Sequence, residues 1–304
     1  MKTGRTVNFA IAFFCLGTVS VSFAFRSVGA WSNGGFSTDP SDPRYGTHDW
    51  LAHHALDWVP DDLDFWVRDN LGVYLYGTEL PDNRNAPLGD GIGDTMLHHV
   101  YYRSTGRLQD DASAKRAQEA YQNTLSHLIS RDYRAAAKWM GITAHYVADM
   151  AVFGHVMGSA TDWGSEKHHS DYENWVNSRT DNYSSSFTSY LTFDRALESI
   201  SAHDAALKLA HDTTFDDSGK GRTAKWMDDQ YDTDNALFKE RVGESLNLAT
   251  NLIAEVIYGA SAAAGIPEFT MPLIVLGLSL VAVVVLGRRK QACRPPVKPS
   301  WDST

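Results

Sequence analysis

Two histidine–carboxylate pairs with the same spacing are the residues of this sequence that most directly suggest chemistry. His145 precedes Asp149 by four residues, and His169 precedes Glu173 by four residues. Residues four apart project from one face of an α-helix, so each pair would present an imidazole beside a carboxylate. His155 stands between the two pairs, directly after a glycine at which a helix can end and turn the imidazole back. These residue types at this spacing predict a metal site.

The ligand types favour zinc. Imidazole nitrogens and carboxylate oxygens, without sulfur, suit Zn²⁺. The only two cysteines, Cys15 and Cys293, lie near the chain ends, which excludes a disulfide scaffold or a cysteine-ligated site in the body of the protein. A single pair would more often be a surface ion pair. Two pairs in register, with a histidine between them, favour the metal site over that alternative.

The elements that carry these residues are expected to be helices. Residues 111–129 are rich in alanine and contain no Gly or Pro, and apolar residues recur every three or four positions over 133–152. A further helix is expected to begin at 173–175 and another to cover 194–213. The last is expected over 235–263, with Asp232 or Asp234 capping its start.

Alternating strand patterns are nearly absent, and no internal repeat is visible. We therefore expect an all-α, single multi-helix domain over residues 31–265. Segments 76–93 and 159–167 are rich in Gly, Pro, Asp and Ser, which predicts functional loops rather than linkers. A calcium site at Asp90 and Asp94, in the first of these loops, is a lesser possibility.

The first 30 residues are typical of a secretory signal peptide. Lys2 and Arg5 precede a mainly apolar run, and the segment closes on small residues that end at Ala30. This pattern predicts removal by signal peptidase after Ala30. Cleavage after Ala24 and a retained membrane anchor are the alternatives.

The other end contains an apolar run of 17 residues, 271–287, followed by three basic residues. That length is at the short limit for a membrane span, and the basic cluster would stay cytoplasmic. Pro267-Glu268-Phe269 precedes the run, and this order resembles the archaeal Pro-Glu-Phe sorting signals, which implies a C-terminal sorting enzyme. Residues 266–290 are thus expected to be a sorting signal or an uncleaved transmembrane helix, and 291–304 a tail. Both interpretations place the body at the cell surface, attached to the membrane through the C-terminus.

The body between these ends is strongly acidic. Residues 31–265 contain 19 Lys and Arg against 35 Asp and Glu, a net charge of −16, whereas the whole chain carries −10. Such a charge repels polyanions at long range. Stable binding of nucleic acid, which normally leaves a basic footprint, is therefore not expected.

Several further segments accompany the histidine–carboxylate pairs. The chain contains Tyr45-Gly46-Thr47-His48, a loop that ends at Asp82, and adjacent histidines at His98 and His99. With His145, Asp149, His155, His169 and Glu173, this set resembles the secreted zinc-dependent phospholipases C of bacteria, over 31–173. That family shares an all-α fold with the fungal zinc-dependent single-strand nucleases.

The resemblance implies three zinc ions and nine protein ligands. It gives the first ion Asp82, His99, His145 and Asp149, the second His155, His169 and Glu173, and the third His48 and the amino terminus of Trp31, with Asp149 bridging. His98 and His168 remain the alternatives to their neighbours, because spacing cannot choose between adjacent histidines. The amine of Trp31 exists only once Ala30 is removed, so the uncleaved precursor is expected to lack one zinc and be inactive.

The expected activity is cleavage of phosphodiester bonds. Zinc ions neutralise charge that develops on the attacking and leaving oxygens, and they make bound water acidic. Asp82 would act as a catalytic residue by accepting a proton from that water. The preferred substrate is a phospholipid, split into diglyceride and a phosphorylated head group. Single-strand nuclease activity and a non-catalytic surface protein stabilised by zinc are the alternatives.

Overall fold

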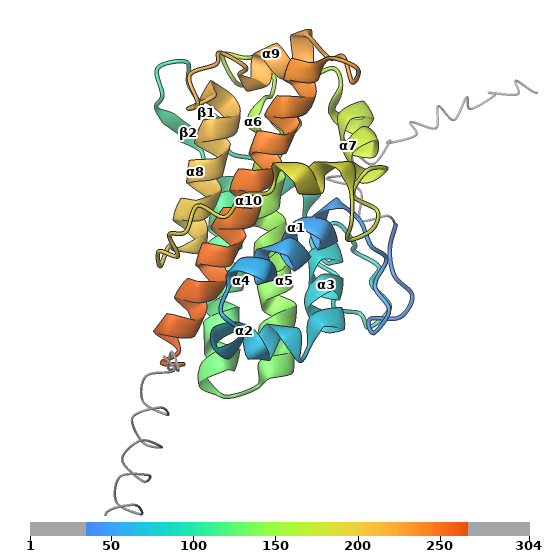
Figure 1. The fold of residues 1–304 in the computed structure, drawn as a ribbon, viewed down its shortest axis with the longest axis vertical. Helices are drawn as coiled ribbons and strands as arrows, with labels where there is room; N and C mark the ends of the chain where they lie inside the picture. Colours follow the sequence, from blue (N-terminus) through green and yellow to red (C-terminus); the bar gives the residue numbers. More distant parts are fainter. Residues whose placement is uncertain (1–34, 267–304) are drawn as a thin grey trace, which may run out of the picture.

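The computed structural model describes residues 35–266, which form ten α-helices, four short 3₁₀ turns and one small hairpin (Figure 1). The first part of the chain forms α1 Thr47–Ala55, η1 Leu56–Trp58, α2 Asp61–Arg68, α3 Leu71–Glu79 and η2 Thr95–Leu97. The hairpin is β1 Tyr101–Tyr102 and β2 Leu108–Asp110. The remainder comprises α4 Ala112–Ile129, α5 Tyr133–Ala148, η3 Asp149–Ala151, α6 Phe153–Val156, α7 His169–Asn177, η4 Ser186–Tyr190, α8 Ala202–Phe215, α9 Ala224–Asp229 and α10 Ala236–Ala263. The prediction of an all-α multi-helix fold is confirmed.

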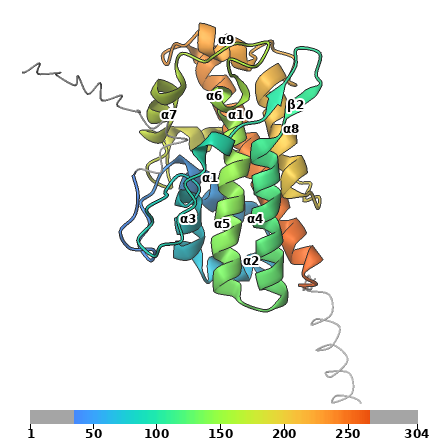
Figure 2. The same ribbon diagram turned by 180° about the vertical axis from the view of Figure 1, so that it is seen from behind.

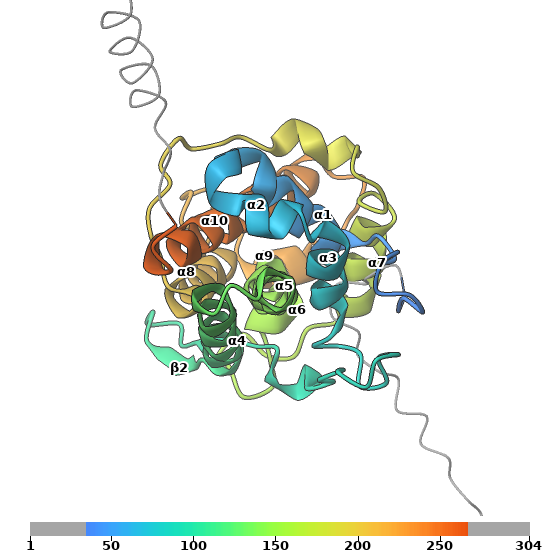
Figure 3. The same ribbon diagram turned by 90° about the horizontal axis from the view of Figure 1, so that it is seen from below.

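Helix α5 is the central element of the fold. Figure 3 shows it surrounded by α1, α2, α3, α4, α8 and α10, and from Met140 to Ala148 every residue is buried. Figure 2 shows α4 running antiparallel beside it. Asp132 caps the start of α5 by accepting a hydrogen bond from the backbone N–H of Ala135. One continuous apolar core joins these helices and includes residues from the last turns of α5. The C-terminal end of α5 therefore lies in the interior of the protein.

Helices α3 and α5 cross at backbone contact. A Cβ at Gly141 would lie 1.9 Å from the carbonyl oxygen of Tyr74, and one at Gly77 would lie 2.3 Å from that of Lys138. Only glycine permits this approach. The crossing brings the end of α3 against the last turns of α5, where His145 lies.

Several helix boundaries differ from the sequence-based expectations. The helix expected over 194–213 begins only at Ala202, where Ser201 caps it. Upstream, the side chains of Asn247 and Asn251 on α10 hydrogen-bond the backbone of Thr192 and Asp194, which holds that segment out of a helix.

The remaining differences are smaller. Asn235 caps the last helix, so the expectation of Asp232 or Asp234 was wrong. The helix expected to begin at 173–175 begins at His169, and the one expected over 133–152 ends at Ala148 and continues as a 3₁₀ turn. The expected loop 76–93 starts later, because α3 extends to Glu79.

Both chain ends lie outside the described residues. The signal peptide, Trp31 and the apolar run 271–287 are therefore predictions on which the described structure has no bearing. Within residues 35–266, none of the helices is both long and apolar enough to cross a membrane.

The α3–α5 crossing gives a stability prediction. Gly141→Ala should lower the free energy of unfolding by about 1–3 kcal/mol, because the added methyl group would force the two backbones apart. Urea denaturation would measure the loss. Gly72→Ala, in the first turn of α3, is the matched control, since its Cβ would lie 3.2 Å from the nearest atom and needs only a small adjustment. Equal stability of the Gly141 variant and the wild type would contradict the proposed contact.

Candidate metal centre

The Asp149 carboxylate lies at the centre of four imidazoles. Its two oxygens lie 3.0 Å from His98 Nδ1, 3.2 Å from His145 Nε2, 3.4 Å from His48 Nε2 and 3.7 Å from His155 Nε2. Asp149, His48 and His145 are almost completely buried. Asp149 follows the last residue of α5 and is four residues from His145, so the predicted shared face is confirmed.

A second group lies beside the first. His169 and Glu173 occupy successive turns of α7, with 2.9 Å between His169 Nε2 and Glu173 Oε1. His155, on the single turn α6, lies 3.5 Å from the same oxygen. The glycine before His155 lets the His169 ring pack against this turn, because a Cβ at Gly154 would lie 2.6 Å from that ring. His155 therefore lies between Asp149 and Glu173 and links the two groups.

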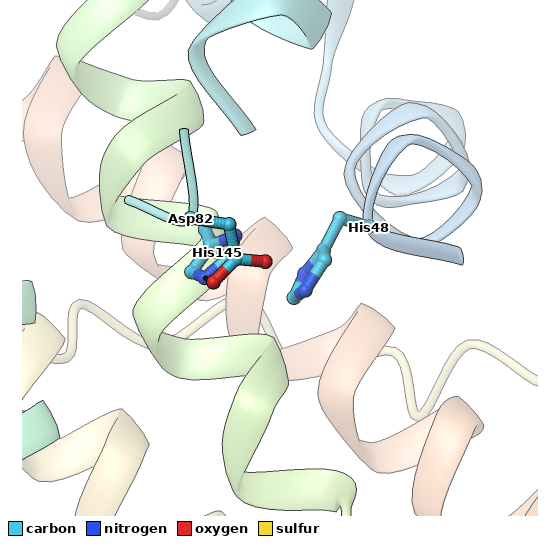
Figure 4. Close-up of side chains that lie close together, drawn as sticks. All are labelled: His48, Asp82 and His145. Carbon is cyan, nitrogen blue, oxygen red and sulfur yellow. Dashed lines mark ion pairs between the residues drawn. The ribbon is translucent and has the colours of Figure 1, made fainter. Parts of the chain in front are cut away.

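His48 and Asp82 complete the first group. His48 comes from the start of α1 and stacks on His145 at 4.0 Å between ring centroids. Asp82 follows α3, and its Oδ1 lies 3.4 Å from His98 Nδ1 and 3.8 Å from His145 Nε2. Figure 4 shows His48, Asp82 and His145 directed into one space from α1, the loop after α3 and α5.

The donor atoms gather in three sets of three residues, and two of these sets share His145. Within each set, one ligand atom from every residue lies within 4.8 Å of the others. The sets are His48, Asp82 and His145; His98, His145 and Asp149; and His155, His169 and Glu173.

Three histidines of the cluster have an acceptor at the ring nitrogen that faces away from the centre. His145 Nδ1 donates to the Thr78 carbonyl oxygen at 2.6 Å, which leaves the Nε2 lone pair facing Asp149. His98 Nε2 lies 3.2 Å from Asp94, and His169 Nδ1 lies 3.4 Å from Glu166. Acceptors of this kind fix the tautomer and ring orientation of metal-binding histidines. The residues Thr78, Asp94 and Glu166 were not predicted as supports, because their roles follow from tertiary contacts.

The charges in this pocket are strongly coupled. Burial raises the pKa of Asp82 to about 6. Burial also disfavours charge on His98, but the nearby Asp149 and Asp94 carboxylates outweigh it and raise the His98 pKa to about 10. For Asp149, the imidazoles of His145, His155 and His98 outweigh burial and hold its pKa well below the ordinary value. The buried carboxylates thus attract positive charge to this pocket.

In the adjacent pairs His98–His99 and His168–His169, one ring lies in the cluster and the other lies outside it. His98 joins the cluster, whereas His99, which the alignment with the family had favoured, points to Asp110 at 3.2 Å and stacks on Tyr101. The choice of His99 is therefore corrected, because a residue within an irregular segment has no helical spacing to decide its direction. In the other pair, His169 lies in the cluster, and His168 stacks on Tyr231 outside it.

Asp90 and Asp94, the carboxylates of the lesser calcium alternative, both have partners within the protein. Asp94 accepts hydrogen bonds from Tyr146 at 2.8 Å and Arg116 at 2.6 Å. Asp90 instead pairs with Lys138 at 2.9 Å. Each acid therefore already has cationic or hydroxyl partners of its own.

The residues fit zinc. Six buried polar atoms of the cluster residues have no hydrogen-bond partner among the described residues: both ring nitrogens of His48, Asp82 Oδ1, both carboxylate oxygens of Asp149, and His155 Nε2. Buried polar atoms without partners are costly, and a cation shared among them removes that cost. The donors are imidazole nitrogens and carboxylate oxygens, which are ordinary zinc ligands.

The alternative positions give a direct test. His98→Ala should reduce the zinc bound per chain, because it removes a donor between Asp82 and Asp149. His99→Ala is the matched control and should retain the wild-type content, since its ring faces Asp110. Elemental analysis after dialysis would measure both, and the reverse order of losses would contradict the placement of His98.

Comparison with known proteins gives the family. The family described as zinc dependent phospholipase C matches residues 47–241. Among solved structures, the alpha toxin of Clostridium absonum is 14% identical with a TM-score of 0.48, covering 77% of this chain and 66% of that chain. The alpha-toxin of Clostridium perfringens avian strain SWCP is 14% identical with a TM-score of 0.44, covering 77% and 67%. A search of the curated proteins finds no match. The family match spans more than half of the sequence and includes every described residue of the cluster, so this chain belongs to the zinc dependent phospholipase C family.

Proposed function

We propose that this protein is a zinc-dependent phosphodiester hydrolase that acts like a phospholipase C, releasing diglyceride and a phosphorylated head group. The observation that carries the proposal is the set of partnerless buried polar atoms around Asp149. More donors converge there than a purely structural zinc site, closed by four ligands, requires.

We further propose that three zinc ions bind. The first would be held by Asp82, His98, His145 and Asp149, the second by His155, His169 and Glu173, and the third by His48, Asp149 and the amino terminus of Trp31. When bound, zinc supplies positive charge for the phosphate oxygens and lowers the pKa of water at the site.

Residues of the chain itself would bind the substrate and accept the proton from the attacking water. A cavity of about 370 Å³ opens beside Asp82, between residues 36–38 and 82–87. The backbone and hydroxyl of Ser37 bond the buried Glu79 carboxylate, which anchors the first of these segments. Asp82 borders both the cavity and the cluster, so it can accept a proton from the attacking water. Arg84, on the cavity wall, is exposed and can bind a phosphate oxygen.

Exposed apolar side chains favour a lipid substrate. Of the large apolar residues that are exposed in the described chain, four lie in the segments next to Asp82 and His98: Phe36, Leu88, Met96 and Leu97. Phe36 and Pro87 both line the cavity, and Leu88 follows Pro87. Apolar side chains around a site are suited to contact with lipid.

A single-strand nuclease of the same fold is the second candidate, and the aromatic Phe36 beside the cavity would allow base stacking. The net charge of −16 over residues 31–265 opposes stable binding of a long polyanion. A non-catalytic role for zinc is disfavoured by the open cavity beside Asp82.

The location of the protein is also a proposal. The basic start and apolar run of residues 1–30 support secretion with removal by signal peptidase. The apolar run and basic cluster of residues 266–290 support attachment at the cell surface, through a retained helix or a sorting enzyme.

The activity can be tested with protein that begins at Trp31. With zinc, it should hydrolyse phospholipid vesicles and a soluble chromogenic phosphodiester, and metal removal should abolish both activities. Single-stranded DNA should be cleaved far more slowly. Cleavage of DNA alone would favour the nuclease, and no cleavage by a zinc-loaded protein would favour the structural role.

The lipid preference makes a separate prediction. Leu88→Asp should lower hydrolysis of vesicle lipid about tenfold and leave hydrolysis of the soluble diester unchanged, because a charge there opposes contact with the lipid interface. Ile129→Asp is the matched control: Ile129 is 69% exposed and Leu88 66%, but Ile129 ends α4 and neither it nor its neighbours line the cavity. Equal effects of the two variants on vesicle hydrolysis would contradict the lipid contact.

A further inference from the structure

Helix α7 begins without a local cap. His168 occupies its N-cap position, and the side chain makes no capping hydrogen bond. The backbone N–H groups of Lys167 and His168 instead donate to Asp228 Oδ1 at 2.8 and 3.1 Å. Asp228 lies on α9, about 60 residues further along the chain, and is only 2% exposed. A distant carboxylate thus accepts hydrogen bonds from the N-cap residue and from the residue before it, and it fixes the chain where the helix begins.

Helix α9 contacts both elements of the His155–His169–Glu173 group. It packs against α6, which carries His155, and Figure 1 shows α9 directly above α6. Its Asp228 holds the start of α7. Tyr231, two residues after α9, stacks on the His168 ring at 4.4 Å between centroids, with 6° between the ring planes. The relative position of α6 and α7 therefore depends on α9.

The amides that Asp228 holds lie between two functional side chains. Glu166, whose carboxylate supports His169 Nδ1, precedes them, and His169 follows directly. His169 is the first residue of α7, so a shift in the first turn of this helix moves its ring relative to His155 and Glu173. The tight fit of the His169 ring against Gly154 leaves little room to absorb such a shift.

We propose that Asp228 is a positioning residue for the zinc ion of the His155–His169–Glu173 group. It is not a ligand. Its carboxylate fixes the start of α7 against α9 and α6, so that the three donor atoms stay close enough to share one ion. The inference rests on the proposed function only in that this group binds zinc.

The two carboxylate oxygens of Asp228 have different surroundings, which allows variants that separate their roles. Asp228 Oδ1 accepts both hydrogen bonds, whereas Oδ2 is buried without a hydrogen-bond partner among the described residues. Asp228→Asn keeps the accepting oxygen and breaks none of these bonds, while Asp228→Ala removes it. The adjacent Asp229 is the matched control, because among the described residues it pairs only with the exposed side chains of Lys225 and Lys167 and accepts no hydrogen bond from the backbone amides at the start of α7.

The test is the zinc affinity of the full protein, measured by competition with a chelator and by the zinc retained per chain. Asp228→Ala should bind one of its ions about 10–100-fold more weakly and leave the others unchanged. Asp228→Asn should restore most of that affinity, and Asp229→Ala should match the wild type. If Asp228→Ala does not fold, Asp228→Ser, whose hydroxyl is too short to reach both amides, should show the same selective loss.

Three results would overturn the inference. The first is zinc binding by Asp228→Ala equal to that of Asp229→Ala. The second is an equal weakening of every ion, which would indicate general destabilisation. The third is an Asp228→Asn protein as weak as Asp228→Ala, since the accepting oxygen would then not matter. A wild-type protein that binds no zinc would overturn the proposed function as well, which separates that failure from these three.

Discussion

The burial of one carboxylate among four imidazoles is the constraint on which the rest of this structure depends. Asp149 has no exposed surface, and its oxygens lie at ion-pair distance from imidazole nitrogens but accept no well-directed hydrogen bond from the described residues. An isolated carboxylate in such surroundings would be very costly, and its charge is tolerated only because positive charge can gather around it. The surrounding residues come from α1, the segment after η2, α5 and α6, so the fold must bring four distant segments to one point.

The helices meet this constraint through contacts between backbones and capping groups. The glycine contact between α3 and α5 places the Thr78 carbonyl where His145 Nδ1 can donate to it. Thr78 also donates to Asp49, and Asp49 accepts the Gly46 amide at the start of α1. The helix that carries His48 is thereby tied to the helix that supports His145. Orientation of the ligands is thus built into the packing, as the pre-organisation of a metal site requires.

Much of the fold and half of the site follow from local patterns. Periodicity located α4, α5 and α10 to within a few residues, and the four-residue spacing brought His145 to Asp149 and His169 to Glu173. Where the deciding contact is distant, local patterns fail. Asn247 and Asn251 on α10 keep residues 192–194 out of a helix, and the sequence of that segment does not predict this contact. The direction of His98 likewise depends on Asp94 and Asp149 rather than on its neighbours in sequence.

The contacts of α9 have a consequence for the loop between α6 and α7. Residues 157–168 join the two helices covalently, yet α9 holds both helices in place from outside. Two connections therefore act on the distance between His155 and His169: the covalent path through the loop, which also carries Glu166 beside His169, and the non-covalent path through α9.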